Sequence, residues 1–406
     1  MRDMVSLLEI VRSTQARFVQ TQLGPYTTYF LWNKEAAAEI LHNRKGVFTK
    51  GPTLKKFAKP ILGNGIIPAN DEDAKKQREV VSGAFSSGFD DHYIKIFFDH
   101  TQKTCGEWKK EGAFLLEQEM TRLSLDLLGK TLLATDFSQY EGKMMTATKD
   151  MYEYILGCMK NPFITNINLP FGRFKKAKRS LALFHQILED ILINMEDGEK
   201  VGFLKDVSFL SPQDYKDMVL NIFFAGHETT STCLFWTVSL LLQHPQAYQE
   251  VKQEVCDLTE DELITYTKRS DSFMAKVILE SMRLYPPVHT VGRELTHSSE
   301  VCGESFKQGD LFVVSLYLMG RNPDIFDNPT RFNPHRFDDD ALLQEMMPYS
   351  LGPRACLGKH FADIELRAVL LTILRGFDLK GRDDNKQGLK FYITLRPQSD
   401  MTVTIE

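Results

Sequence analysis

The chain has few cysteines, and none of them stand close enough together to suggest a zinc site or a disulfide framework. Its six cysteines, among 406 residues, are at positions 105, 158, 233, 256, 302 and 356 and include no CxxC pair. Zinc sites and small disulfide-stabilised domains both depend on closely spaced cysteines. The spacing therefore favours reduced thiols, and we expect a cytoplasmic protein.

The chain also lacks an excess of positive charge and an uninterrupted apolar segment of membrane-spanning length, and we expect no secretory leader. The formal net charge is −5 and the pI is about 6.1, whereas nucleic-acid-binding proteins are usually basic. Charged residues begin directly after Met1, which is not typical of a leader. The longest apolar stretch, 218–242, contains three consecutive polar residues after His227. We therefore expect a buried helix there, and no transmembrane segment.

No repeat, low-complexity linker or change of composition divides the chain, so we expect a single domain over residues 1–406. The hydrophobic fraction of 43% is ordinary for a globular protein. Periodicity and capping residues predict a mainly α protein with small β-sheets, an α+β fold. Helices are predicted over residues 34–42, 73–85, 114–135, 180–195, 212–243 and 359–374, and strands over 16–23, 27–32, 311–317, 389–395 and 401–405.

The most informative segment runs from Pro348 to Gly358 and places Cys356 just before a helix-like stretch. The glycines in this segment allow the backbone to pass close to a flat ligand. The positive end of a helix favours a thiolate, and a thiolate held in this way is a strong axial ligand for haem iron. Taken alone, however, one cysteine in a glycine-rich turn is more often a buried structural residue.

The residues around Cys356 favour the haem ligand. The segment resembles the haem-binding loop of the cytochrome P450 family, with Tyr349, Gly352, Arg354, Cys356 and Gly358 at the family's spacing. The family usually has phenylalanine at the first of these places. Tyrosine keeps the ring that would cover the sulfur, but its hydroxyl needs a partner if it is buried. The resemblance implies that Cys356 is the metal ligand and that these residues bind haem b.

A second motif lies inside the long apolar helix, where Gly226 is followed by His227, Glu228, Thr229 and Thr230. Glycine weakens a helix interior by roughly 1 kcal/mol relative to alanine, and threonine can bond the backbone. The pattern therefore predicts a widened turn with room for water or oxygen. A zinc-binding HExxH helix is excluded because position 231 is serine. A structural polar patch remains the alternative.

This second motif resembles the oxygen-activation motif of the P450 family. The resemblance implies that Gly226 faces the iron and that Glu228 and Thr229 form an acid–alcohol pair, which delivers protons during catalysis. His227 is assigned no role and is expected to point away from the haem. Peroxide-driven members typically lack the acid–alcohol pair, so its presence favours an O2-dependent enzyme.

A third motif is Glu280-Ser281-Met282-Arg283, in which the acid and the base share a helix face. Such pairs are common on solvated helices and carry little information alone. The motif resembles the ExxR motif of the P450 family, which Arg336 would complete from a distant coil. A buried cluster of Glu280, Arg283 and Arg336 would keep the Cys356 loop in place. Losing one member would cost on the order of 3–5 kcal/mol.

Arginine forks bind carboxylates well, and the propionate groups of haem are carboxylates. The resemblance assigns propionate binding to Arg354, Arg293 and Arg78. Arg78 departs from the family pattern, because Ala74 stands four residues earlier where Trp or His is common.

The sequence thus predicts a cytochrome P450 monooxygenase that inserts one atom of O2 into an apolar substrate by hydroxylation or epoxidation. No flavin or ferredoxin domain is apparent. We therefore expect electrons from a separate ferredoxin or flavodoxin and its NAD(P)H-dependent reductase, docking near Lys359 and His360. Two alternatives stay open. One is a peroxide-dependent haem-thiolate enzyme, and the other is a non-catalytic haem-thiolate sensor or electron-transfer protein.

The expected substrate pocket leans apolar, which suits a fatty acid, a terpenoid or another lipid. It would draw on residues 53–70, the loops before the 180–195 helix, Phe223–Phe224 and residues 288–291. A basic run at 173–179 precedes that helix, and such runs are usually solvated. Weak peripheral membrane contact and an acidic substrate group are the alternatives for it.

Overall fold

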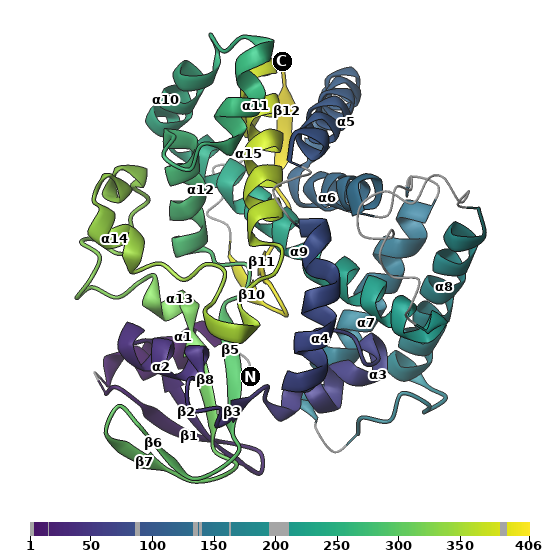
Figure 1. Cartoon of the computed structure of the whole chain (residues 1–406). Helices are drawn as coiled ribbons and strands as arrows, with labels where there is room; N and C mark the ends of the chain where they lie inside the picture. Colours follow the sequence, from purple (N-terminus) through teal and green to yellow (C-terminus); the bar gives the residue numbers. More distant parts are fainter. Residues whose placement is uncertain are drawn as a thin grey trace.

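Two regions make up the computed structural model, a sheet-containing region at the lower left of Figure 1 and a larger helical region at the top and right. The structure describes residues 4–14, 16–85, 90–132, 137, 140–161, 164–194, 211–381 and 388–406. The ends of two predicted helices, 133–135 and Met195, lie outside these residues. The mixture of many helices and several small sheets confirms the expected α+β class.

The largest sheet joins strands from both ends of the chain, in the order β1-β2-β8-β5-β3. Its strands are β1 (Val19–Leu23), β2 (Tyr26–Leu31), β8 (Leu311–Ser315), β5 (Thr290–Leu295) and β3 (Phe48–Thr49). The predicted turn at Gly24, with φ +60°, connects β1 to β2. Helix α2 (Lys34–His42) follows directly, and the Asn33 side chain caps it by accepting from Ala36 N.

Helix α9 (Pro212–Gln243) crosses the helical region and supplies one wall of the candidate site. Ser211 caps it by accepting from Asp214 N at 3.1 Å, as the Ser-Pro start predicts. Almost all of its side chains between Tyr215 and Leu241 are buried, because α6 (Leu116–Leu132), α12 (Phe273–Leu284) and α15 (Lys359–Gly376) pack against it. Among the described residues, no helix is both long and apolar enough to cross a bilayer.

The remaining elements surround this core. The helices are α1 (Met4–Ser13), α3 (Lys59–Leu62), α4 (Asp71–Val81), α5 (Asp90–Glu111), α7 (Glu141–Lys160), α8 (Gly172–Asn194), α10 (Pro245–Val255), α11 (Glu260–Lys268), α13 (Leu316–Met319) and α14 (Asp340–Gln344), with a π-helix η1 (Thr53–Ala58) and 3₁₀ turns η2 (Ser82–Phe85), η6 (Pro334–Asp338) and η7 (Gly352–Arg354). The smaller sheets contain β4 (Ala113–Leu115), β12 (Thr402–Ile405) and β9 (Leu379–Gly381), then β10 (Leu389–Phe391) with β11 (Leu395–Pro397), and β6 (Ser299–Val301) with β7 (Glu304–Phe306).

Several predicted boundaries are wrong. The predicted helix 73–85 is α4, which runs from Asp71 to Val81, and the helix predicted from residue 114 begins as β4 and becomes α6 at Leu116. The predicted strand 311–317 ends at Ser315, where α13 follows. Helix α8 begins eight residues before Ser180, so the basic run lies within it, because buried Phe174 and Ala177 extend its apolar face. The predicted strand 389–395 is instead part of the β10–β11 hairpin, since Leu389 pairs with Pro397. Residues 307–310, whose composition is typical of a hairpin turn, instead lead from β7 to β8, and these two strands belong to different sheets.

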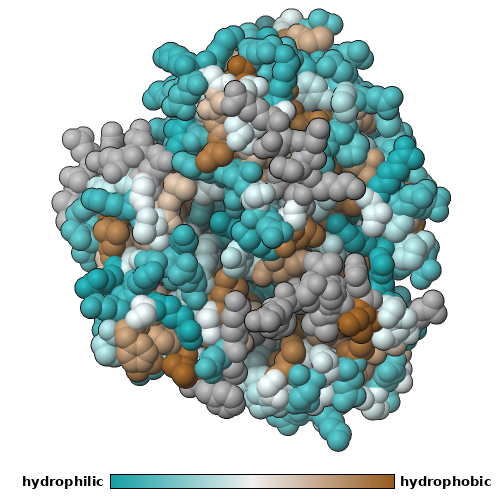
Figure 2. Space-filling model, turned by 180° about the vertical axis from the view of Figure 1, so that it is seen from behind, coloured by the Kyte–Doolittle hydropathy of each residue, from teal (hydrophilic) through white to brown (hydrophobic). Residues whose placement is uncertain are grey.

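The rear face of the molecule is mostly hydrophilic, and hydrophobic residues occur on it in small groups (Figure 2). The core itself is buried beneath it in three clusters, of which the largest surrounds α9 and α15. Exposed single apolar side chains are normal for a folded protein. The largest buried cluster therefore lies between the same helices that position the candidate site.

Candidate active site

The Cys356 loop is a tight structure at the start of α15. The backbone N–H of Cys356 donates to the Tyr349 carbonyl at 2.8 Å and closes the loop. Gly352 has φ +73°, and a Cβ there would lie 2.1 Å from the Leu41 carbonyl oxygen, so only glycine fits. α15 then begins directly after Gly358.

The Cys356 thiol is exposed at a position between the loop and the helix, yet the surrounding protein desolvates it. This desolvation raises the pKa of Cys356, while the N–H of Gly358 and the charge of Arg78 act in the opposite direction. Such donors stabilise a thiolate once a metal ion replaces the proton. The sulfur is therefore accessible to a ligand at the start of α15.

Arg354 lies largely buried beside the same loop. Its guanidinium donates to the Ala69 carbonyl at 2.8 Å and to the Ile66 carbonyl at 3.3 Å, and it pairs with the exposed Asp71 carboxylate at 2.7 Å. These bonds hold the segment that precedes α4 against the Cys356 loop. Arg354 therefore has a structural role in addition to any role in binding a ligand.

Lys50 is a site residue that the sequence analysis missed. Its ammonium group donates to the Ile67 carbonyl at 2.5 Å. Burial, together with the charges of Arg354, Arg293 and Arg78, lowers its pKa from 10.5 to about 7. The only signal in the sequence is a lysine directly after a short strand, and that pattern is too common to identify a site.

The four cations fit the propionate groups of the expected haem. Arg293 is buried, and its pKa is lowered to about 10 by burial and by Arg354. The pKa of Arg78 is also lowered, chiefly by burial, while Cys356 raises it. Asp71 is the one carboxylate among the charges acting on Lys50, Arg78 and Arg293. Several partly desolvated cations at one place require anions, and carboxylates of a ligand would supply them.

Ala74 is fully buried and offers no polar group, so the place that carries Trp or His in many relatives makes no bond here. Lys50 instead adds a cation beside Arg78 and Arg354. Together these residues can hold a flat dianionic cofactor next to the sulfur of Cys356.

Replacing Lys50 by methionine distinguishes its effect on the stability of the cofactor-free protein from its effect on haem binding. Because the pKa of Lys50 is depressed in the folded state, its destabilising contribution is present below about pH 7 and disappears as the pH rises towards 10.5. We expect the K50M cofactor-free protein to melt at a higher temperature at pH 6 and to lose this pH dependence. The haem-loaded variant should release haem about tenfold faster, because a charged hydrogen bond is lost.

The control for this experiment is Lys75→Met, which removes an exposed lysine from α4. Melting curves of the cofactor-free protein between pH 6 and 10, and haem transfer to an acceptor protein, give the two readouts. Unchanged values in K50M for both would contradict a role for Lys50 at the site.

The middle of α9 is a regular α-helix, so the predicted widened turn is wrong. The Thr229 hydroxyl donates to the Ala225 carbonyl at 2.6 Å and thereby satisfies itself within the helix. Ala225 is exposed and Thr229 half-buried, whereas their neighbours in the helix are buried apart from half-buried Gly226. These two residues, four apart on one face, form the open side of α9.

Gly226 is half-buried and lies next to Ala225 on α9. A Cβ at this position would lie 2.9 Å from Leu128 Cδ1, so the missing side chain lets α6 approach α9. His227 is buried, with Nδ1 2.7 Å from the Phe223 carbonyl and its ring against that of Phe223. Its side chain therefore packs among neighbouring apolar groups.

Glu228 and Thr229 are adjacent in sequence, but their side chains have different partners. Glu228 is buried, and its Oε1 accepts from Thr394 Oγ1 at 2.6 Å and from Arg396 Nε at 2.9 Å. Its other oxygen, Oε2, makes no hydrogen bond of ordinary length to the described residues, although the Tyr152 phenol is close enough to interact with this carboxylate. Arg396 also reaches Glu117 at 3.4 Å, so an ion-paired chain leads from Glu228 towards a partly exposed carboxylate.

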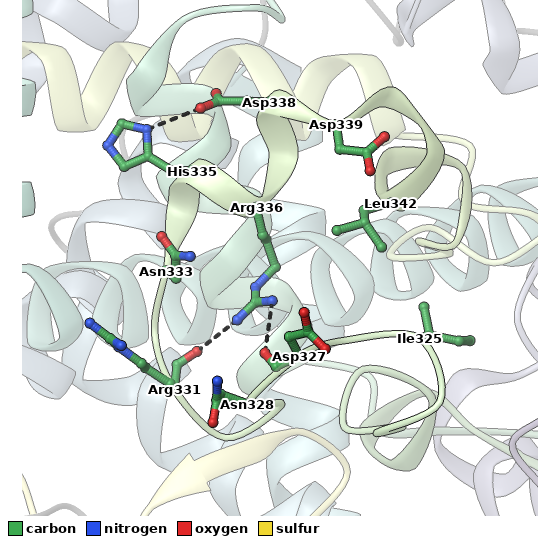
Figure 3. A pocket seen from close by; sticks show the side chains of 10 residues that line it. All are labelled: Ile325, Asp327, Asn328, Arg331, Asn333, His335, Arg336, Asp338, Asp339 and Leu342. Carbon is green, nitrogen blue, oxygen red and sulfur yellow. Dashed lines mark hydrogen bonds and ion pairs between the residues drawn. The ribbon is translucent and has the colours of Figure 1, made fainter.

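The structure brings Glu280, Arg283 and Arg336 together in a buried cluster. Arg283 Nε and Arg336 Nε donate to the two oxygens of Glu280 at 2.6 and 3.1 Å. Glu280 also accepts from the backbone of Asn333 at 2.9 Å. Figure 3 shows Arg336 donating to the carbonyl oxygens of Arg331 and Asp327, at 3.2 Å in each case. The cluster therefore binds the coil that precedes the Cys356 loop to α12.

An open pocket of about 670 Å³ lies beside this cluster. Its lining residues are Ile325, Asp327, Asn328, Arg331, Asn333, His335, Arg336, Asp338, Asp339 and Leu342. The lining includes neither Cys356 nor the open face of α9, so this pocket is separate from the candidate active site.

The expected pocket lining needs one correction. Phe223 and Phe224 are buried, and their rings pack against Phe184 and Tyr152 of α8 and α7. They therefore belong to the helical core. Val288, by contrast, is 40% exposed and stands before β5, at a place where a ligand can reach it.

Comparisons with known proteins agree with this geometry. The family model described as Cytochrome P450 matches residues 3–403. The chain is 24% identical to "Cyclooctatin synthase" of Streptomyces melanosporofaciens, over 95% of this chain and 86% of that protein. It is 25% identical to "Cyclooctat-9-en-7-ol 5-monooxygenase" of the same organism, over 89% and 82%. Identity with "Leukotriene-B4 omega-hydroxylase 3" of Mus musculus is 25%, over 95% and 81%.

Proposed function

Because the chain belongs to the cytochrome P450 family, we propose that it is a haem b monooxygenase that hydroxylates or epoxidises an apolar substrate. The observation that carries the proposal is the accessible thiol of Cys356 together with a nearby group of four cations, Lys50, Arg78, Arg293 and Arg354. Asp71 is the one carboxylate among the charges acting on Lys50. Bound haem would supply O2 activation, with one oxygen atom inserted into the substrate and the other reduced to water. The names of the relatives include a 5-monooxygenase and an omega-hydroxylase, which supports this reaction class.

Different residues would bind the iron, hold the propionates and border the substrate. The Cys356 thiolate would bind the iron, with the Gly358 N–H and Arg78 stabilising its charge. Lys50, Arg293 and Arg354 would hold the propionates. The open face of α9, formed by Ala225 and Thr229, would border the reacting atoms.

Proton delivery would use the polar groups of α9. The Thr229 hydroxyl is the polar group on the open face, and it donates a hydrogen bond to the Ala225 carbonyl. Arg396 and Thr394 hold Glu228 through Oε1, which leaves Oε2 as the atom that can take up and release a proton. Ordered water between Glu228 and Thr229 would complete the path.

Electrons would arrive at the face of the molecule where α15 begins. Lys359 is exposed there, while His360 is paired with Asp90 at 2.8 Å. An acidic ferredoxin or flavodoxin, reduced by an NAD(P)H-dependent reductase, would suit the charge of Lys359. The proposed substrate class is a fatty acid, a terpenoid or a similar lipid. The apolar character of residues 53–70 and 288–291, which are expected to line the substrate pocket, favours this class.

Replacing Thr229 by alanine tests the reaction class. We expect the yield of oxygenated product per NAD(P)H consumed to fall by about tenfold or more, because the proton donor on the open face is lost. NAD(P)H consumption should continue, with hydrogen peroxide as the product. The control is Thr237→Ala, since Thr237 is a buried threonine of the same helix that donates to the Cys233 carbonyl at 2.8 Å.

The two other hypotheses predict different results. A peroxide-dependent enzyme would form product from hydrogen peroxide alone and would be insensitive to Thr229→Ala. A sensor or electron-transfer protein would form no oxygenated product with any reductase and would show no spectral change with apolar ligands.

A further inference from the structure

Tyr349 differs from the usual phenylalanine of the family, and the structure shows what its hydroxyl does. It donates to Asp363 Oδ1 at 2.5 Å. Asp363 lies on the second turn of α15, seven residues after Cys356. The bond therefore joins Tyr349, at the start of the Cys356 loop, to a carboxylate on the helix that follows the sulfur.

The ring of Tyr349 lies within electrostatic range of Cys356 and also of Cys233 on α9. Lys359 Nζ is 5.9 Å from the ring centroid. Tyr349 therefore stands between the sulfur, a carboxylate and an exposed cation. A polar group in this position can influence the charge on the sulfur.

Asp363 is held in place by several neighbours. Burial raises the pKa of this carboxyl group, while the Tyr349 hydroxyl, Arg367, Lys359 and His360 lower it. Arg367 is itself buried and donates to the Thr267 carbonyl at 2.6 Å, so its charge is fixed near Asp363. Among the residues that the structure describes, the carboxylate accepts one side-chain hydrogen bond, and its donor is the phenol of Tyr349.

We propose that Tyr349 and Asp363 act as a pair that increases electron donation by the Cys356 thiolate and lowers the reduction potential of the bound haem. The inference rests on the proposed function, because it requires a haem bound to Cys356. A carboxylate that accepts from the phenol makes the ring more electron-rich, and negative charge near a metal centre favours its oxidised state. Tyr349 and Asp363 are positioning residues, since neither binds the iron.

The test is a reductive titration of the haem protein with a chemical reductant and an indicator dye, without any protein partner. Asp363→Asn should increase the equilibrium constant for reduction about tenfold, which equals a rise of about 59 mV for a one-electron couple. Tyr349→Phe should shift it in the same direction by a smaller factor. The double variant should resemble Asp363→Asn alone, because the two groups act as a unit.

A second readout reports donation by the sulfur itself. The C–O stretching frequency of the reduced carbon monoxide complex should rise in both single variants, because a weaker thiolate donor leaves less electron density for the ligand. Asp90→Asn is the control. It removes a carboxylate that is paired with His360 on the same face, and it should leave both readouts unchanged.

Unchanged potentials and C–O frequencies in both single variants would overturn the proposal, since they would show that the pair only fastens the loop to α15. An equal shift in Asp90→Asn would also overturn it, because any carboxylate would then have the same effect. If Asp363→Asn fails to retain haem, Tyr349→Phe decides the question, since phenylalanine is the family's usual residue there. A wild-type protein without a haem-thiolate spectrum would contradict the proposed function instead.

Discussion

Cys356→Ser is expected to abolish the red-shifted Soret band of the dithionite-reduced carbon monoxide complex and all monooxygenase activity. The band depends on an iron–thiolate bond. A serine hydroxyl ionises far less readily than a thiol, so the groups that favour a thiolate at this place cannot compensate. The measurement is a visible spectrum of the reduced protein with and without carbon monoxide.

The matched control is Cys256→Ser, which changes an exposed cysteine at the end of α10. Its spectrum should equal that of the wild type. A wild-type complex that looks histidine-ligated, or a Cys356→Ser complex with the same band as the wild type, would refute the ligand assignment and every role that depends on it.

The second large effect is expected from Arg283→Leu, which should destabilise the protein by about 3–5 kcal/mol. Arg283 is fully buried, and each of its five N–H groups has an acceptor. Two donate to Glu280 at 2.6 and 2.7 Å, and the others go to the carbonyls of Gly320, Pro329 and Arg331. Leucine would leave Glu280 as a buried charge with only Arg336 to balance it, and would leave three carbonyls without this donor.

The midpoint of urea unfolding, with the haem absorbance followed in parallel, provides the measurement. Haem should be lost at a lower urea concentration than in the wild type, because the cluster holds the coil that leads to the Cys356 loop. Arg269→Leu is the control, since Arg269 is exposed and its pair with Asp271 lies at the surface. Equal midpoints for Arg283→Leu and Arg269→Leu would show that the buried cluster contributes no more than a surface pair.

Several features could be predicted from sequence because their causes are local. Asn33 and Ser211 cap their helices with side-chain bonds to backbone groups three residues ahead. Pro212 and the His244-Pro245 step mark the ends of α9 for equally local reasons. The spacing of Tyr349, Gly352, Arg354, Cys356 and Gly358 likewise lies within ten residues. Together with the family resemblance, this spacing predicts Cys356 as the haem ligand.

Other features depended on contacts between residues far apart in the chain. Glu228 is adjacent to Thr229, yet its carboxylate bonds to Arg396, 168 positions away. Lys50 becomes a site residue only because the fold places it near Arg78, Arg293 and Arg354. A buried charge takes whichever partner the packing brings within reach, and sequence spacing does not encode that choice.

By itself, then, the sequence predicted the capped starts of α2 and α9, the family and the reaction class, since capping and motif spacing act over a few residues. The tertiary structure decided which face of α9 stays open, because the approach of Leu128 to Gly226 turns that side towards α6. It also decided that the Tyr349 hydroxyl meets Asp363, since only the packing of the loop on α15 brings these groups together. Burial and charge compensation act through space, and for that reason they appear only in the folded protein.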